Sequence, residues 1–235
     1  MEKMRFGLRK MTLLDFPGKV ACTVFTCGCN FRCPFCHNAS LVRGRQEDME
    51  LSAAELFDFL ARRTKLLDGV AVTGGEPLLH PGTAELLRRI KEMGYAVKLD
   101  TNGSFPERLK ELVESGTVDY VAMDVKSSPE RYDVLCGREG MAPAVAQSMA
   151  ILMNGKVDYE FRTTVVNELH EVADIAGAAR SIAGAKRYFL QNFTETDDLL
   201  SPWGAFSGAG KEKLQAMLEA ARNYVPATEL RGVDM

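Results

Sequence analysis

Residues 20–38 read VACTVFTCGCNFRCPFCHN, a short β-rich run that leads directly into a loop crowded with cysteines. Residues 20–25 are rich in small, apolar and β-branched side chains, a composition that predicts a buried β-strand. In the loop that follows, Cys29, Cys33 and Cys36 have the spacing C-x3-C-x2-C. The stretch therefore places three thiols at the carboxyl end of a predicted core strand, the end at which parallel α/β folds carry their chemistry.

The alternation of β-rich runs and amphipathic helical stretches continues along the rest of the chain. We predict five further strands, over residues 69–73, 95–100, 118–125, 158–165 and 187–193. Between them lie helical patterns with one apolar face. The first begins with the capping box Ser52-Ala53-Ala54-Glu55, and two others end at Gly94 and Gly116, where glycine favours termination.

Six strands that alternate with helices imply a parallel sheet with right-handed crossovers. A closed eight-fold barrel usually needs about 250 residues, whereas this chain of 235 residues offers six units with a leader and a tail. We therefore predict an α/β fold, an open, partial (β/α)6 barrel. No linker, repeat or low-complexity tract divides the sequence, so residues 1–235 are predicted to form one domain, with the loop at 27–38 as its cluster loop.

Composition argues against several classes of function. The chain has 29 Lys and Arg against 32 Asp and Glu, so nucleic acid is not an expected partner. The first ten residues lack the apolar stretch of a signal peptide, and no apolar run approaches the roughly 18 residues that cross a membrane. A cytoplasmic protein is expected. Six cysteines in that compartment indicate metal or redox chemistry rather than disulfides.

The cysteine triplet suits an iron–sulfur cluster better than a structural zinc ion. Zinc sites usually have four ligands, often in two pairs. Three thiolates on one short loop can instead hold a cubane [4Fe-4S] cluster with one iron left open to another ligand. The alternatives are a zinc knuckle with His37 or Cys27 as fourth ligand, and Cys27 in place of Cys29, which breaks the spacing. Cys22 and Cys136 are expected to be buried small hydrophobic residues, or in the case of Cys136 an idle loop thiol.

The longer string around these cysteines is similar to a known family. C-x3-C-x2-C at the end of a first strand is the signature of the radical S-adenosylmethionine (radical SAM) enzymes. Residues 14–18, LDFPG, and residues 25–38 together resemble the glycyl-radical-enzyme activases, and among them the anaerobic ribonucleoside-triphosphate reductase-activating proteins. The pyruvate formate-lyase activases share the same skeleton. The resemblance extends over nearly the whole chain, although its motifs lie mostly in the first 130 residues.

The resemblance implies a binding site for S-adenosylmethionine (SAM) at successive strand ends. Residues 72–77, VTGGEP, resemble the motif in which the backbone of Gly74 and Gly75, with Glu76, receives the amino group of the methionine moiety. Residues 99–103, LDTNG, resemble a second motif of the same pocket, which includes Asp100 and Asn102. Taken alone, these strings have plainer explanations as turns and helix caps. The remaining residues expected near the cofactor are Phe35, Lys126 and Arg162.

A monovalent cation is a further implication of the resemblance to the pyruvate formate-lyase activases. Asp100, Thr101, the Ala122 carbonyl and Asp124 could hold such an ion beside the cofactor carboxylate, since oxygen ligands of mixed type suit a hard cation. The two-residue period of a strand places Ala122, Asp124 and Lys126 on one face, toward the barrel interior or its mouth. A purely structural ion pair between Asp124 and Lys126 is the alternative.

The activity implied is that of a radical SAM activase. SAM would be cleaved reductively at the cluster on Cys29, Cys33 and Cys36, and the 5′-deoxyadenosyl radical would remove an α-hydrogen from a glycine of a partner enzyme. The expected partners are anaerobic ribonucleotide reductase as protein substrate and a flavodoxin- or ferredoxin-type reductant. Another glycyl radical enzyme, a small-molecule substrate, and a non-catalytic iron or zinc module are the rival hypotheses.

Three details complete the sequence-based expectations. The chain reads LQNF at residues 190–193, where pyruvate formate-lyase activases carry a histidine, and this favours the reductase branch. It lacks the extra cysteines of a ferredoxin-like insertion, so a single cluster is expected. His80 and His170 are expected to be solvated, and residues 15–18 are expected to line a lateral gap of the open barrel that admits a protein loop.

Overall fold

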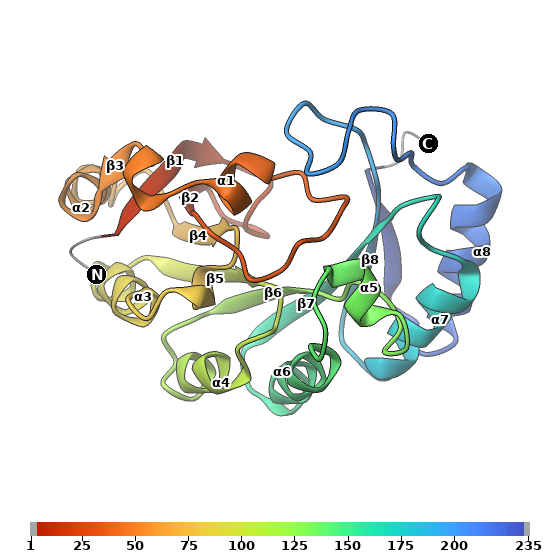
Figure 1. Ribbon diagram of the computed structural model, residues 1–235. Helices are drawn as coiled ribbons and strands as arrows, with labels where there is room; N and C mark the ends of the chain where they lie inside the picture. The colour runs from red at the N-terminus through yellow and green to blue at the C-terminus, as the bar shows by residue number, and fades with distance from the viewer. Residues whose placement is uncertain (1–3, 233–235) are drawn as a thin grey trace.

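The alternating pattern of the sequence produces one curved sheet with helices along its outer side (Figure 1). The computed structural model describes residues 4–232. The strands are β1 (Arg5–Thr12), β2 (Ala21–Thr26), β3 (Leu51–Ser52), β4 (Gly69–Gly74), β5 (Ala96–Thr101), β6 (Tyr120–Asp124), β7 (Asp158–Val165), β8 (Tyr188–Asn192) and β9 (Thr228–Arg231).

The helices connect these strands in the order expected of βα units. They are α1 (Ala39–Arg43), α2 (Ala53–Ala61), α3 (Thr83–Glu92), α4 (Pro106–Glu114), α5 (Tyr132–Cys136), α6 (Ala142–Asn154), α7 (Val172–Ser181) and α8 (Lys211–Arg222), with short 3-10 turns η1 (Gln46–Asp48) and η2 (Pro77–Leu79). The predicted capping box opens α2, where the Ser52 side chain accepts from the Glu55 amide. Within residues 4–232, no helix is long and apolar enough to cross a membrane.

The strand order across the described residues is β3-β1-β2-β4-β5-β6-β7-β8-β9. From β2 to β9 every neighbouring pair is parallel, whereas β1 pairs antiparallel with both β2 and β3. The six predicted strands correspond to β2, β4, β5, β6, β7 and β8, each within two residues of the predicted bounds. The α/β fold with a partial (β/α)6 barrel is therefore confirmed, and β1, β3 and β9 extend its sheet.

The two faces of the barrel strands differ in chemistry. In β6, Val121 and Met123 are fully buried in the main hydrophobic core, whereas Tyr120 and Asp124 alternate with them on the opposite, inner face. The helices supply the matching apolar stripes, as in α3, where Leu86, Leu87 and Ile90 are completely buried. The outer face of the sheet thus carries the core, which leaves the inner face available for polar and charged groups.

The loop between β1 and β2 covers the amino end of the barrel. Phe16 is 3% exposed and packs against Ala21 and Tyr120, with its ring 6.2 Å from that of Tyr120. A Cβ added to Gly69 would meet the Phe16 ring at 2.9 Å. Since Ala21, Gly69 and Tyr120 begin β2, β4 and β6, Phe16 sits at the end opposite to the cluster loop. The expectation that residues 15–18 line an opening beside the site is therefore wrong.

Because Phe16 fills this end of the barrel, Phe16→Ala should remove core packing and leave a cavity. We expect the free energy of unfolding to fall by about 3–4 kcal/mol. Leu14→Ala in the same loop is the matched control, because Leu14 is 90% exposed and its loss should cost less than about 0.5 kcal/mol. Urea unfolding followed by circular dichroism measures both variants, and equal losses would contradict this role.

Candidate active site

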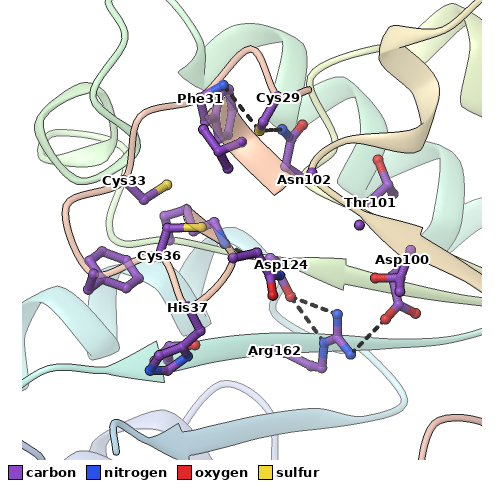
Figure 2. A pocket seen from close by; sticks show the side chains of 18 of the residues that line it. Cys29, Phe31, Cys33, Cys36, His37, Asp100, Thr101, Asn102, Asp124 and Arg162 are labelled. Atoms are coloured by element: carbon purple, nitrogen blue, oxygen red, sulfur yellow. Dashed lines mark hydrogen bonds and ion pairs between the residues drawn. The ribbon is translucent and has the colours of Figure 1, made fainter. Parts of the chain in front are cut away.

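A cavity of about 260 Å³ opens at the carboxyl ends of the parallel strands, beside the cluster loop (Figure 2). Most of the residues predicted from the sequence line it. These are Cys29, Cys33, Phe35, Cys36, Gly74, Gly75, Asp100, Thr101, Asn102, Asp124, Lys126 and Arg162. Two others, Glu76 and Ala122, do not line it and are fully buried. The strand ends therefore gather motifs that lie far apart in the sequence.

The three cluster-loop thiols are held in a largely buried environment. Burial raises the pKa of Cys29 to about 11, that of Cys33 to about 12 and that of Cys36 above its usual value, although the Lys126 ammonium opposes each rise. Without a metal these groups are neutral thiols at physiological pH. A bound metal centre would supply the positive charge that converts them to thiolates.

The chemistry of these donors suits an iron–sulfur cluster. Three cysteine side chains line one cavity, and a cubane cluster binds each cysteine ligand through a different iron. Cys27 is 2% exposed and does not line the cavity. Cys22 and Cys136 are both fully buried, as expected.

Two glycines bring the end of β4 against the backbone of the cluster loop. A Cβ at Gly74, where φ is +127°, would lie 2.1 Å from the Thr26 carbonyl oxygen, and a Cβ at Gly75 would lie 2.1 Å from that of Gly28. The Gly75 amide donates to Thr26 O at 3.0 Å. Only glycine permits this approach, and it exposes backbone rather than side chain to the cavity.

Glu76 fixes the turn that follows β5. Its carboxylate accepts hydrogen bonds from Leu78 N at 2.9 Å, Thr101 Oγ1 at 2.8 Å and Asn102 N at 2.7 Å. Burial raises the pKa of Glu76 to about 7, against three donors that favour the ionised form. The Asn102 carboxamide in turn lies 3.8 Å from Cys29 Sγ. Glu76 thus links the motif at residues 72–77 to the motif at residues 99–103. Its side chain is buried and does not line the cavity.

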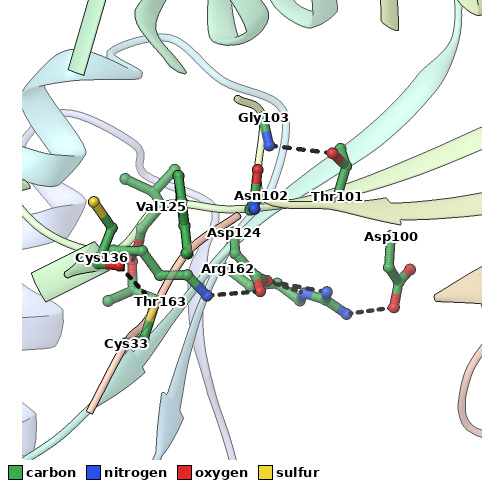
Figure 3. A network of polar contacts seen from close by, with 12 residues as sticks. Cys33, Asp100, Thr101, Asn102, Gly103, Asp124, Val125, Cys136, Arg162 and Thr163 are labelled. Atoms are coloured by element: carbon green, nitrogen blue, oxygen red, sulfur yellow. Dashed lines mark hydrogen bonds and ion pairs between the residues drawn. The ribbon is translucent and has the colours of Figure 1, made fainter. Parts of the chain in front are cut away.

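Alternating charges form the floor of the cavity. Arg162 Nε donates to Asp124 Oδ1 at 3.0 Å, and its Nη1 donates to Asp100 Oδ2 at 3.4 Å (Figure 3). Lys126 Nζ donates to Asp124 Oδ2 at 3.0 Å, and Lys98 donates to Asp100. The prediction that Asp124 and Lys126 share the interior of the barrel or its mouth is confirmed, because both line the cavity, and the two also form the ion pair given as the alternative. Two cations, Lys126 and Arg162, and two anions, Asp100 and Asp124, line the cavity, so their charges balance.

The proposed cation ligands have other partners in this structure. Arg162 joins the carboxylates of Asp100 and Asp124. The Thr101 hydroxyl donates to a buried carboxylate, and Ala122 is enclosed in the ladder between β5 and β7. The guanidinium therefore supplies the positive charge that a monovalent cation would bring. The monovalent cation therefore stays a prediction.

Two histidines expected to be solvated are instead part of the framework. His170 is fully buried: Nδ1 accepts from the Val166 amide at 3.1 Å, Nε2 donates to Lys126 O at 2.9 Å, and the ring meets that of Phe35 edge-on at 6.0 Å. Burial lowers the pKa of His170, which keeps the imidazole neutral. His80 is half-buried and bonds to the Cys27 carbonyl at 2.6 Å. The prediction was wrong because the sequence around a loop histidine does not show which distant segments it will contact.

Some residues of the cavity wall were missed by the sequence analysis. Thr164 and Gln191 line the cavity from the ends of β7 and β8. The sequence could have indicated both, because side chains alternate between the two faces of a strand. This alternation places Thr164 on the same face as Arg162, and Gln191 on the face opposite to the buried Leu190. His37 also lines the cavity, through stacking on the Phe193 ring at 4.8 Å. That contact depends on a loop distant in sequence and had no local signal.

Comparison with known proteins agrees with this geometry. Residues 23–175 match the radical SAM superfamily, a span that runs from β2 through the cluster loop to α7. The chain belongs to this superfamily. Membership implies a [4Fe-4S] cluster and SAM as cofactors, and the three thiols around the cavity fit that cluster.

Relatives within the radical SAM superfamily differ in their substrates. A protein of Methanocaldococcus jannaschii, provisionally named a glycyl-radical enzyme activating enzyme, is 28% identical over 242 residues, which cover 100% of this chain and 98% of that protein. The pyruvate formate-lyase-activating enzyme of Clostridium pasteurianum is 34% identical over 128 residues, 51% of each chain. The 7-carboxy-7-deazaguanine synthase of Methanopyrus kandleri is 33% identical over 130 residues, 47% of this chain and 51% of that one.

Solved structures support the same fold. A domain of the pyruvate-formate lyase-activating enzyme from Bacteroides vulgatus superposes with a TM-score of 0.55 at 18% identity, covering 70% of this chain and 99% of that one. At this identity the similarity concerns the fold alone. The chain is a radical SAM enzyme, and its substrate has to be argued from further observations.

The charge floor makes a prediction about pH. Burial alone would raise the pKa of Asp124, but Lys126 and Arg162 outweigh it and lower that pKa to about 2. An acid with a depressed pKa stabilises the fold above its unfolded pKa near 4 and loses that contribution as the pH falls toward 2. Asp124→Asn should therefore be destabilised at pH 7, by about 3–5 kcal/mol, because two buried cations lose a partner.

The difference between Asp124→Asn and the native protein should shrink as the pH falls from about 4 to 2. After allowance for the third of the Asp124 side chain that solvent reaches, we expect the difference to shrink by about 1–2 kcal/mol. Urea unfolding at a series of pH values measures it. A difference that stays constant over this range would refute the assignment of the ion pairs.

Proposed function

We propose that this protein is a glycyl-radical-enzyme activase whose substrate is an anaerobic ribonucleoside-triphosphate reductase. The observation that carries the proposal is the similarity, along the full length of the chain, to a provisionally named glycyl-radical enzyme activating enzyme. A second support is that the site has cysteines for one cluster only, since Cys22, Cys27 and Cys136 are buried and do not line the cavity. A second cluster of the kind that extends many small-molecule enzymes would need further thiols.

Cys29, Cys33 and Cys36 would hold the [4Fe-4S] cluster, with one iron left to bind SAM. When bound, the cluster supplies the electron that cleaves SAM to methionine and a 5′-deoxyadenosyl radical. The chain's own residues position and shield the reactants. Burial of the thiols and the packed cavity wall limit the access of water, which protects a reactive species.

The charged floor gives the methionine end of SAM complementary partners. Lys126 and Arg162 would face the carboxylate, and the exposed backbone at Gly74 and Gly75 would receive the amino group. Asp100 and Asp124 hold Arg162 in place, so their contribution acts through the guanidinium.

The adenine end of SAM would pack against Phe35. This aromatic side chain is 4% exposed and lines the cavity. Its ring is held edge-on by the buried His170. Asn102, which lies between Cys29 and the cavity wall, would complete the pocket. An offset or edge-on aromatic partner suits a flat purine ring.

The second candidate function is radical chemistry on a small molecule. The observation in its favour is the 33% identity to a 7-carboxy-7-deazaguanine synthase over 130 residues. Another glycyl radical enzyme, such as a pyruvate formate-lyase, is the nearer alternative. In each case a flavodoxin- or ferredoxin-type protein would serve as the one-electron donor.

The cluster itself can be tested first. Protein reconstituted without oxygen should hold about four irons per chain, and its reduced electron paramagnetic resonance signal should change when SAM is added. Serine at position 29, 33 or 36 should abolish both properties, whereas Cys22→Ser and Cys136→Ser should retain them. Stoichiometric zinc without iron after anaerobic purification would exclude a cluster.

A deuterium label tests the identity of the protein substrate. The activase, SAM and a one-electron reductant should install a glycyl radical on the reductase of the same organism, and deuterium on that glycine's α-carbon should appear in 5′-deoxyadenosine. The Cys36→Ser variant provides the blank. If deoxyadenosine is released without label and without a glycyl signal, the substrate lies elsewhere while the radical SAM chemistry stands.

A further inference from the structure

The chain between β8 and α8 crosses from one side of the barrel mouth to the other. We call residues 194–206 the strap. It leaves β8, lies against the cluster loop and α1, and returns toward α8 (Figure 1). The next residue, Ser207, donates through its Oγ to Glu168 at 2.5 Å. The sheet continues through β1 and β3 on one side and β9 on the other. The strap runs from the end of β8 to the loop that follows β2, so at the carboxyl end it bridges the open side between these two halves of the sheet.

Polar contacts fasten the strap to the loop that carries the thiols. Asp198 accepts from Ser40 N at 2.8 Å and from Ser40 Oγ at 2.6 Å. The Leu200 amide donates to Cys36 O at 3.3 Å, and Ser201 Oγ donates to Pro34 O at 2.8 Å. These bonds join the strap directly to the residues that flank the third cluster cysteine.

The apolar contacts of the strap are partial: Leu199 and Phe206 pack against the core without being buried, and the Phe206 ring lies 6.5 Å from that of Phe193. No residue from Thr194 to Gly208 is buried, although Phe193 and Ala209 on either side of this stretch are 3% and 5% exposed. The bonds from Ser40 to Asp198 are solvent-exposed. Segments with few buried contacts and exposed hydrogen bonds open locally at a small fraction of the global unfolding free energy. Buried residues therefore hold the two ends of the strap, whereas its middle is held by hydrogen bonds to Pro34, Cys36 and Ser40. We call these hydrogen bonds the clasp.

From this geometry we infer that the strap is a gate that admits a protein substrate through the side of the barrel. The inference rests on the proposed function, because only a macromolecular substrate needs the side of the barrel to open. A small cofactor reaches the cavity by the mouth with the strap closed. A glycine within a large protein has to arrive on a loop, and the strap lies across the open side through which that loop would pass.

The clasp can be weakened by one substitution. Asp198→Ala removes both bonds to Ser40, and Asp197→Ala removes the same charge from the neighbouring position, which is exposed. In the cluster-loaded protein, the Leu200 amide bonds to Cys36 O across the clasp and keeps that acceptor in both variants. Its hydrogen exchange should rise by about ten-fold in Asp198→Ala, with little change in Asp197→Ala or at Val42, which bonds within α1.

Trp203 reports on the strap directly. It is the one tryptophan of the sequence and is 69% exposed. Labelled with 5-fluorotryptophan, the protein should give a single fluorine resonance from residue 203. Addition of the unlabelled reductase should shift or broaden that resonance, whereas SAM alone should leave it in place.

Two rate measurements distinguish opening of the strap from the cleavage of SAM. With reductase below saturation, Asp198→Ala should speed glycyl radical formation several-fold, while release of 5′-deoxyadenosine without reductase stays at the native rate. Exchange that is equal in the two variants, or faster exchange without faster radical formation, would overturn the gate. If the native protein forms no glycyl radical on the reductase, the proposed function is wrong, and a gate for that substrate is wrong with it. The hydrogen-exchange data would still show whether the strap opens.

Discussion

The guanidinium of Arg162 is the interaction on which the site depends. It stands on β7 and reaches the carboxylates of Asp124 on β6 and Asp100 on β5, so three adjacent strand ends are tied through one side chain. Burying any of these charges alone would be costly. Together with Lys98 and Lys126 they satisfy one another, which allows a charged surface to line the interior of a barrel whose apolar core lies on the outside.

Under the proposed function, this floor explains why the residues that would bind the cofactor come from separate strands. A single strand end presents one or two side chains on a given face, too few to bind both ends of a zwitterion. Three strands held in register by ion pairs present alternating charges over a surface wide enough to do so. The glycines of β4 add backbone groups to the same surface, and Glu76 locks the turn beside them from below.

Much of this architecture was predictable because it follows from local periodicity. The strands of the barrel, the helix that begins at the Ser52 capping box, and the shared face of Asp124 and Lys126 all follow from spacing along the chain. The cysteine spacing likewise identified the cluster loop. Such features depend on residues within a few positions of one another, where sequence and geometry are tightly linked.

What escaped prediction depends on contacts between distant segments. The inward turn of Glu76 and the burial of His170 are decided by partners tens of residues away, and β1 lacks the continuous apolar pattern of a core strand because three of its residues face solvent. The location of Phe16 has a wider consequence. Because Phe16 fills the amino end of the barrel, a small molecule in the cavity has no passage through that end and has to enter and leave from the carboxyl side. The product of one turnover therefore has to leave by the same mouth before the next small molecule can enter.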